Sequence, residues 1–119
     1  MKNSVEIKEI PRQTLQIEQD SIGALMATID DEFVEVVETI YRCKGRVVVS
    51  GIGKSAIVAQ KIVATFNSTG TPALFMHAAD AIHGDLGMVQ KEDVVICISK
   101  SGDTPEVKVL VPLVKSMGN

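Results

Sequence analysis

Three short polar stretches of this sequence carry side chains that could hold an anion or move a proton. The first is Ser50–Ser55 (S-G-I-G-K-S), the second is His77–Asp85, and the third is Ser99–Thr104 (S-K-S-G-D-T). Each follows a short apolar run of the kind that forms a buried strand. Because the carboxyl ends of parallel strands share one edge of a sheet, the three stretches together would make a ligand site.

The third stretch is the most informative, because its side chains and the helix expected after it would suit a phosphate. Ser99, Ser101 and Thr104 supply three hydroxyls, Gly102 permits an unusual backbone angle, and a helix beginning at Pro105 would present free N–H groups. The alternative is an ordinary helix start, in which the aspartate or threonine caps the helix and the serines satisfy the turn. The pattern alone leaves both interpretations open.

The first stretch resembles two nucleotide-binding motifs without satisfying either. The tripeptide Gly-Lys-Ser at 53–55 is like the end of a Walker A loop, but Val48 stands where that motif needs its first glycine. The pattern G-x-G-x-x-A from Gly51 to Ala56 matches the dinucleotide fingerprint, yet segment 73–77 supplies no acidic residue to hold a ribose. NAD binding is therefore only a minor alternative.

Lys54 and the two histidines are the basic side chains of the first two stretches. Lys54 stands at an expected helix start, where the helix dipole disfavours a cation, and this favours a functional lysine over an ordinary surface one. A histidine in a loop is usually solvent-exposed or a satisfied polar group. His83, followed by Gly84 and Asp85, is a better candidate for chemistry than His77. Two histidines with no cysteine nearby do not give a metal-ligand set, so no metal is expected.

The apolar periodicity predicts the elements that position these stretches. One long amphipathic helix is expected over 13–42, part of which would pack against another subunit. After it we expect strands at 46–50, 73–76 and 93–98, helices at 54–68 and from 105 to about 117, and an irregular segment at 77–89. This order predicts an α/β fold, a doubly wound parallel sheet in a three-layer α/β/α arrangement, preceded by a long helix.

Charge and composition narrow the partners and the location. A net charge of −3, a pI near 5.3, one tyrosine, three phenylalanines and no tryptophan argue against binding to nucleic acid. Charges interrupt the first twenty residues, so no signal peptide fits, and the apolar runs are too short to span a membrane. Cys43 and Cys97 are expected as free thiols of a reducing compartment rather than as a disulfide. These features predict a cytoplasmic protein.

Four blocks, in order and spacing, carry a resemblance to a known family: Gly51–Ser55, Thr65–Pro72, His83–Val89 and Ile98–Thr104. They closely resemble the D-arabinose 5-phosphate isomerases, flavodoxin-like SIS-domain enzymes that supply the Kdo sugar of lipopolysaccharide and of some capsules. The similarity runs from about Gly45 to the end of the chain. It implies interconversion of D-ribulose 5-phosphate and D-arabinose 5-phosphate through a cis-enediol, without a cofactor.

The resemblance also implies roles for individual residues. Lys54, His83 and Glu106 match active-site positions of the family. Glu106 is the candidate acid/base, His83 would assist ring opening or proton transfer between oxygens, and Lys54 would hold the substrate or neutralise the enediolate. Without the resemblance, Glu106 is simply a favourable first-turn acid. The family further implies phosphate-binding residues and loop glycines, which are Ser55, Ser99, Lys100, Ser101 and Thr104, and Gly51, Gly53, Gly84 and Gly102.

The same resemblance sets expectations for the rest of the protein. Residues 1–119 would be an SIS domain with a helical segment 1–44 and a core 45–119, incomplete because family members continue through further strands that carry another glutamate and another histidine of the active site. The CBS domains that many members append are not among these residues. The chain alone is therefore expected to be inactive and poorly soluble. A homo-oligomer, a tetramer by resemblance, and a feedback ligand from the Kdo pathway are further expectations.

Two other functions remain open from the sequence. One is a non-catalytic sugar-phosphate-binding module, the use to which SIS domains are put in some transcription regulators. The acidic character of residues 1–44 counts against a neighbouring DNA-binding helical domain. The other is a lyase or epimerase that acts on a different phosphosugar.

Overall fold

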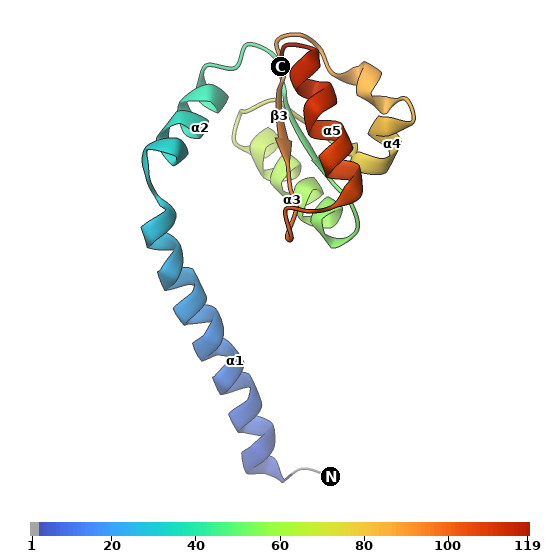
Figure 1. The fold of residues 1–119 in the computed structure, drawn as a ribbon. Coiled ribbons are helices and arrows are strands. Elements are labelled where there is room, and N and C mark those ends of the chain that lie inside the picture. Colours follow the sequence, from blue (N-terminus) through green and yellow to red (C-terminus); the bar gives the residue numbers. More distant parts are fainter. Residues whose placement is uncertain (1–2) are drawn as a thin grey trace. The chain divides into compact units, whose positions relative to one another are not determined.

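The computed structural model describes residues 3–119, which divide into two compact units (Figure 1). The first unit ends at Glu38 and is helical, and the second runs from Thr39 to Asn119 and contains the sheet. The loops that carry the candidate site residues all belong to the second unit.

The helical unit begins with α1 (Ser4–Ala24) and continues through a 3₁₀ turn, η1 (Leu25–Thr28), into α2 (Asp31–Tyr41). The prediction of one helix over 13–42 was therefore wrong at its start and in its continuity. A capping box starts α1 earlier: the Asn3 side chain accepts from the amide of Glu6, and the Glu6 side chain accepts from the amide of Asn3.

A second cap explains the break between α1 and α2. Ile29 has extended backbone angles (φ −84°, ψ 90°), and the Asp30 carboxylate accepts a hydrogen bond from the amide of Phe33 at 3.1 Å. An aspartate that caps a new helix in this way competes with the continuation of the old one. The apolar periodicity runs through the break unchanged, which is why it predicts a single helix.

Apolar side chains along the first unit are exposed. The exposed fraction lies between 47% and 76% for each of these residues of α1, η1 and α2, and for Ile29 between η1 and α2: Val5, Ile7, Ile10, Leu15, Ile17, Ile22, Leu25, Met26, Ile29, Phe33, Val34, Val36 and Val37. The expected amphipathic face is thus present within the described residues, but it buries no side chain in α1, η1 or α2.

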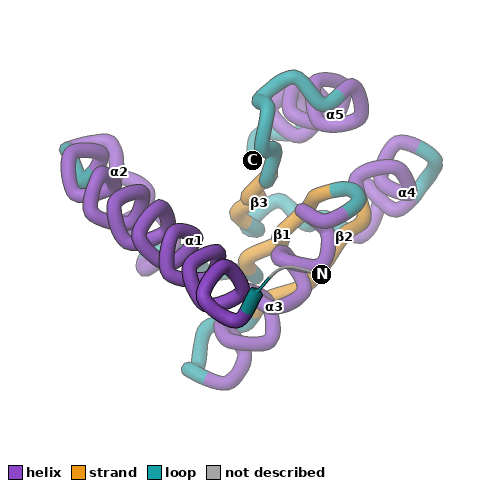
Figure 2. The backbone as a smooth tube through the Cα atoms, turned by 90° about the horizontal axis from the view of Figure 1, so that it is seen from below, coloured by secondary structure: helices purple, strands orange, loops and turns teal. Residues whose placement is uncertain are grey.

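The second unit is built on a parallel sheet of three strands, β1 (Val47–Gly51), β2 (Ala73–His77) and β3 (Val94–Cys97), in the order β2-β1-β3. Helix α3 (Lys54–Ser68) covers one face, and α4 (Ala78–Ile82) and α5 (Pro105–Ser116) cover the other (Figures 1 and 2). The α/β class and the parallel sheet are confirmed. The segment expected to be irregular, 77–89, instead holds α4 and a 3₁₀ turn, η2 (Asp85–Met88).

The pleat of β1 divides the core between the two faces. Val47 and Val49 pack with Ala59 under α3, whereas Val48 packs with Met76 and Leu110 under α4 and α5. All of these side chains are at most 1% exposed. An apolar strand buried on both faces is typical of the centre of a parallel sheet, and it gives the loops at the strand ends a rigid base.

An ion pair between half-buried Arg46 and buried Asp93 joins the amino ends of β1 and β3. Asp93 is 4% exposed, and its carboxylate accepts from the Arg46 amide at 2.7 Å, from Arg46 Nη2 at 2.9 Å and from the Gln90 amide at 2.8 Å. Burial alone would raise the pKa of Asp93, but the hydrogen bonds from Arg46 and Gln90 together hold that pKa below its usual value of 3.8.

We expect this pair to make folding stability depend on acid. A carboxyl whose pKa is lower in the folded state stabilises the fold above its unfolded pKa and loses that contribution as the pH falls through its folded value. The urea concentration at the midpoint of unfolding should therefore decrease as the pH is lowered below about 4. Asp93→Asn should have a lower midpoint at neutral pH and a shallower acid dependence. If the urea midpoints of the wild-type protein and of Asp93→Asn decrease equally with pH, the acid dependence does not come from Asp93.

Candidate functional site

The three polar stretches meet at the carboxyl edge of the sheet. Because β1 is central and parallel to both neighbours, the loop after β1 lies between those after β2 and β3. Gly51 is in register with His77, and the Ile98 amide donates to the Ser50 carbonyl at 2.8 Å. In sheets of this kind, ligands bind in the crevice beyond the strand ends.

The loop after β1 is a tight turn that depends on two glycines. A Cβ at Gly51 would lie 3.0 Å from the carbonyl carbon and oxygen of Ser55, so the helix start approaches the strand closely. Gly53 has φ 60° and ψ −131°, a conformation that other residues rarely adopt. Lys54 is the first residue of α3 and is exposed, while Ser55 is half-buried.

The loop after β3 holds its hydroxyls against its own backbone. Ser99 Oγ lies 2.8 Å from Thr104 Oγ1 and accepts from the amide of Gly102 at 3.0 Å, where φ is 70°. Ser101 Oγ accepts from the amide of Asp103 at 3.1 Å. In the structure, therefore, both serines satisfy the turn. A bound anion would have to compete with these hydrogen bonds for the same donors.

Helix α5 begins directly after this loop with no side-chain cap. Thr104 occupies the N-cap position but makes no capping hydrogen bond, and Pro105 has no N–H to offer. The Asp103 carboxylate pairs with Lys108 at 2.7 Å. The amides at the start of a 12-residue helix thus lack a side-chain acceptor beside a loop that is rich in hydroxyls. Such a helix end favours an anion. Glu106 stands half-buried in this first turn, and Lys100 is exposed.

The segment after β2 brings His83 to the same side of the sheet as Glu106. Ala78 and Ala81 of α4 share the apolar cluster of Val107 and Leu110 in α5, so the two helices pack together. His83 is exposed at the C-terminal cap of α4. Lys54 starts the helix on the opposite face, at the same edge. The fold therefore packs the helix that precedes His83 against the helix that carries Glu106, and Lys54 starts the helix on the other face of the sheet.

His77 has a structural role. Its Nδ1 accepts from the amide of Ala79 at 3.3 Å, and its ring packs edge-on against Phe75 with centroids 6.3 Å apart. A neutral imidazole that accepts at Nδ1 carries its proton on Nε2. His77 is half-buried and His83 is exposed, so the two histidines have different environments.

The family scan matches the SIS domain over residues 40–119. The chain belongs to the SIS-domain family. Two curated relatives are arabinose 5-phosphate isomerases. KdsD of Pseudomonas aeruginosa is 46% identical over 118 residues, covering 99% of this chain and 36% of its own length. GutQ of Escherichia coli K12 is 48% identical over 101 residues, covering 85% and 32%. The chain spans about a third of the length of these relatives.

Solved structures of other proteins share the arrangement of this SIS domain. One is c3406 of Escherichia coli CFT073 in complex with arabinose 5-phosphate, with a TM-score of 0.92 and 42% identity, covering 99% of this chain and 63% of that one. Another is a putative sugar-phosphate isomerase of Listeria monocytogenes, with a TM-score of 0.91 and 40% identity, covering 100% and 63%. The fold predicted from the sequence resemblance is thereby confirmed.

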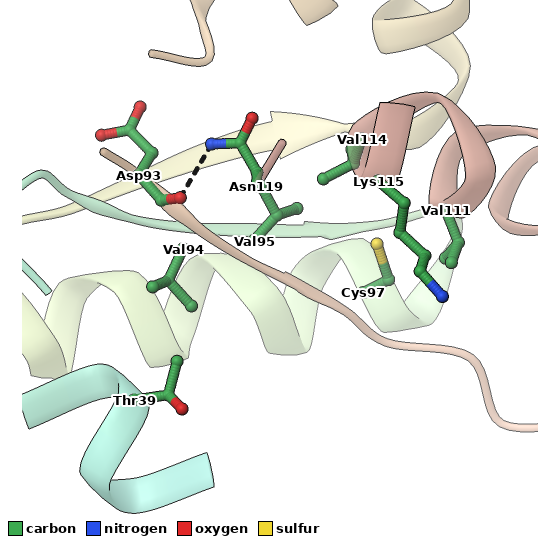
Figure 3. A pocket seen from close by; sticks show the side chains of 9 residues that line it. All are labelled: Thr39, Asp93, Val94, Val95, Cys97, Val111, Val114, Lys115 and Asn119. Atoms are coloured by element: carbon green, nitrogen blue, oxygen red, sulfur yellow. Dashed lines mark hydrogen bonds between the residues drawn. The ribbon is translucent and has the colours of Figure 1, made fainter. Parts of the chain in front are cut away.

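A separate cavity of this SIS domain, of about 370 Å³, runs beside β3 and away from the candidate site (Figure 3). Both cysteines are free, and burial raises the pKa of the Cys97 thiol in the cavity wall. None of the predicted catalytic or phosphate-binding residues lines it, so we do not assign it to the sugar. Its wall is made by Thr39, Asp93, Val94, Val95, Cys97, Val111, Val114, Lys115 and Asn119.

The described residues hold neither a metal-ligand cluster nor a membrane-spanning helix. Across residues 3–119, no three histidine, cysteine, aspartate or glutamate side chains gather closely enough to hold a metal ion. In the same residues, no helix is both long and apolar enough to cross a membrane.

The sequence placed Ser50 in the first polar stretch but did not indicate that its hydroxyl is fully buried and makes no hydrogen bond in the structure. It stands next to the end of the central strand, level with Met76 and Cys97, under α4 and α5. The apolar run that precedes Ser50 gives no signal of this, because the lack of a partner is a property of the folded core.

We expect Ser50→Ala to raise the free energy of unfolding by roughly 1 kcal/mol, because an unpartnered buried hydroxyl carries an uncompensated desolvation cost. Urea denaturation measures the change. Ser116→Ala is the control, since that hydroxyl is exposed and donates to the Leu113 carbonyl, and its removal should change stability by less than about 0.5 kcal/mol. A clear loss of stability in Ser50→Ala would show that the hydroxyl has a partner.

Proposed function

We propose that this SIS domain binds a pentose phosphate and interconverts D-ribulose 5-phosphate and D-arabinose 5-phosphate. The observation that carries the proposal is the uncapped start of α5, which follows the hydroxyl-rich loop Ser99–Thr104 and holds Glu106 in its first turn. The relatives named arabinose 5-phosphate isomerase, and the c3406 complex with arabinose 5-phosphate, support the same ligand class.

The phosphate is held by the loop after β3 and the α5 amides. Ser99, Ser101 and Thr104 turn their hydroxyls from their hydrogen bonds within the loop to the phosphate oxygens, Lys100 adds a positive charge, and Ser55 assists from the other loop. Because the loop donors are already arranged around a turn, binding exchanges internal hydrogen bonds for charge-assisted ones. The sugar then extends from the loop toward the loops after β1 and β2.

Glu106 moves the carbon-bound proton. As a carboxylate it removes a proton from C1 of the ketose, the electron pair of the C–H bond forms the C1–C2 double bond, and the C2 carbonyl oxygen gains a proton to give the cis-enediol. Glu106 then returns its proton to C2 while the C1 hydroxyl loses one and becomes the aldehyde. A single base serves both carbons because they are adjacent.

His83 and Lys54 act on the oxygens. His83 is exposed beside α5 and can exchange protons with solvent and with O1 or O2 during ring opening and enediol formation. Lys54, at the start of α3, offsets the negative charge that develops on the enediolate oxygen. No step of this reaction needs a redox cofactor, because the substrate and product are isomers.

The biological setting belongs to the same proposal. The product would feed synthesis of Kdo for lipopolysaccharide or capsule in the cytoplasm, and an end product of that route would act as a feedback ligand. The exposed apolar side chains of α1 and η1 would be covered by other copies in a homo-oligomer, which is tetrameric by family resemblance.

Incubation with D-ribulose 5-phosphate in deuterated water tests the reaction. The protein is used in its complete natural form. An isomerase that passes the proton through a base exposed to solvent should give D-arabinose 5-phosphate with deuterium at C2, detected by proton NMR. Tight binding of the sugar phosphate with no deuterium exchange would contradict the proposed enzymatic function and favour a non-catalytic binding module. Exchange with a different product would favour another phosphosugar reaction.

A further inference from the structure

The segment that carries His83 has an exposed part between two packed parts. Its start is packed through α4 against α5, and the His77 ring caps α4. Beyond His83, Leu86 and Met88 pack against the apolar cluster under α4 and α5, and Val89 belongs to it. Between these anchors, residues 83–85 and 87 are exposed. Gly84 has φ 143°, and a Cβ added there or at Gly87 would meet no atom within 4 Å. A chain with two glycines and open space around them resists displacement weakly, so its far anchor matters.

Arg46 is the polar anchor of the far end, beside the apolar packing of Met88 and Val89. Its Nη2 donates to the carbonyl of Met88, the last residue of η2, at 2.8 Å, and to Asp93 Oδ2 at 2.9 Å. Its Nε also reaches Asp93 Oδ1, at 3.4 Å. The guanidinium is planar, so a carboxylate held on its Nε and Nη2 side sets the direction of the remaining N–H toward Met88.

Asp93 also holds this end of the segment, through two hydrogen bonds with Gln90. Its Oδ2 accepts from the Gln90 amide at 2.8 Å, and its own amide donates to the Gln90 carbonyl at 3.0 Å. Asp93 is 4% exposed and stands directly before β3, while Arg46 stands directly before β1. The end of the His83 segment is therefore tied to the two strands from which the phosphate loop and the Lys54 loop emerge.

We propose that Arg46 is a positioning residue that, through Met88, sets the place of His83 relative to the phosphate loop. This rests on the proposed function of the site. Arg46 lies at the amino ends of the strands and touches no substrate. It acts by holding the Met88 carbonyl, and with it the end of η2, in place. Four residues separate His83 from Met88, so a shift at Met88 is carried to His83 through little more than one turn of 3₁₀ helix.

The test compares Arg46→Met, which removes the donors, with Arg46→Lys, which restores one. Hydrogen exchange followed by mass spectrometry reports the amides of 84–89 and of α3 separately. Phe66→Leu, which shortens a half-buried side chain of α3 packed on the core, is the control for a general loss of stability. In Arg46→Met, we expect exchange in 84–89 to speed up about tenfold more than in α3, and Arg46→Lys to recover most of this protection. Phe66→Leu should instead speed exchange in both regions alike.

Measurements of kcat and KM distinguish a positioning role of Arg46 from a purely structural one. Because the phosphate loop is untouched, Arg46→Met should leave KM within about threefold and lower kcat about tenfold, whereas Phe66→Leu should change neither below its unfolding temperature. Uniform exchange in Arg46→Met, or an unchanged kcat, would overturn the proposal. If the wild-type protein neither binds nor isomerises the sugar, the proposed function fails, and the exchange comparison still decides whether Arg46 holds the segment.

Discussion

Replacing Glu106 with Gln should slow the isomerisation of D-ribulose 5-phosphate about 10³-fold, which is the usual contribution of a positioned acid/base. Glutamine has nearly the same size but cannot accept a proton from carbon. Glu106 stands in the first turn of α5, two residues after the loop Ser99–Thr104, so the phosphate donors stay in place. The loss should therefore appear in kcat, with KM changed by less than about threefold.

The control for this variant is Glu92→Gln. Glu92 is an exposed carboxylate at the amino edge of the sheet, before β3, and its neutralisation changes the net charge by the same amount. Its kcat should stay within about twofold of the wild-type value. A Glu106→Gln protein that keeps more than a tenth of the wild-type kcat would remove Glu106 from the catalytic role and leave it as a first-turn acid that stabilises the helix.

Gly45→Ala should be the most damaging single change to the fold. A Cβ at this position would lie 2.6 Å from Asp93 Oδ1 and 2.7 Å from the carbonyl carbon and oxygen of Glu92. These neighbours cannot withdraw easily, because the Gly45 amide donates to the Glu92 carbonyl at 3.2 Å and the Asp93 carboxylate is held by Arg46. We expect a loss of at least about 3 kcal/mol in the free energy of unfolding.

Urea denaturation followed by circular dichroism measures this loss. Gly87→Ala is the matched control, because its added methyl group would meet no atom within 4 Å and its φ is ordinary, so its stability should change by less than about 0.5 kcal/mol. A Gly45→Ala protein with the wild-type urea midpoint would show that the amino ends of β1 and β3 yield to the added methyl group, and that the Arg46–Asp93 anchor is loose.

Local patterns predicted the second unit well. The β-branched runs and turn residues predict all three strands to within one residue at each end, and helix α3 begins and ends at Lys54 and Ser68 as predicted. These elements are specified by short-range signals: apolar runs, glycine turns and a proline at the first position of α5. The open parallel sheet follows from the alternation of strands and helices.

The same patterns failed where polar caps override periodicity. The apolar face of the first unit continues through Ile29, yet Asp30 ends one helix and starts the next. In the segment after β2, short helical turns form because alanines pack against α5, a contact that no window around residues 78–88 contains. Helix boundaries and short helices thus depended on side-chain contacts that propensity does not see.

The candidate site was predictable in its parts rather than in its arrangement. The residue types of the three loops suggest anion binding, and the parallel order places them on one edge. The ion pair of Arg46 with Asp93 joins residues 47 positions apart, and the unpartnered hydroxyl of Ser50 exists only in the folded core. Neither leaves a local signal beyond a charged residue that flanks an apolar run. Long-range contacts of this kind need the fold itself.

The most direct test of the account is to locate the phosphate by NMR. The amide signals of the protein are followed while D-arabinose 5-phosphate is added, with D-arabinose, which has no phosphate, as the control ligand. We expect the amide signals of Gly102, Glu106 and Val107 to shift on addition of the phosphate ester and to stay unchanged with the plain sugar. Binding that shifts amides elsewhere, and leaves this loop and the start of α5 unchanged, would contradict it.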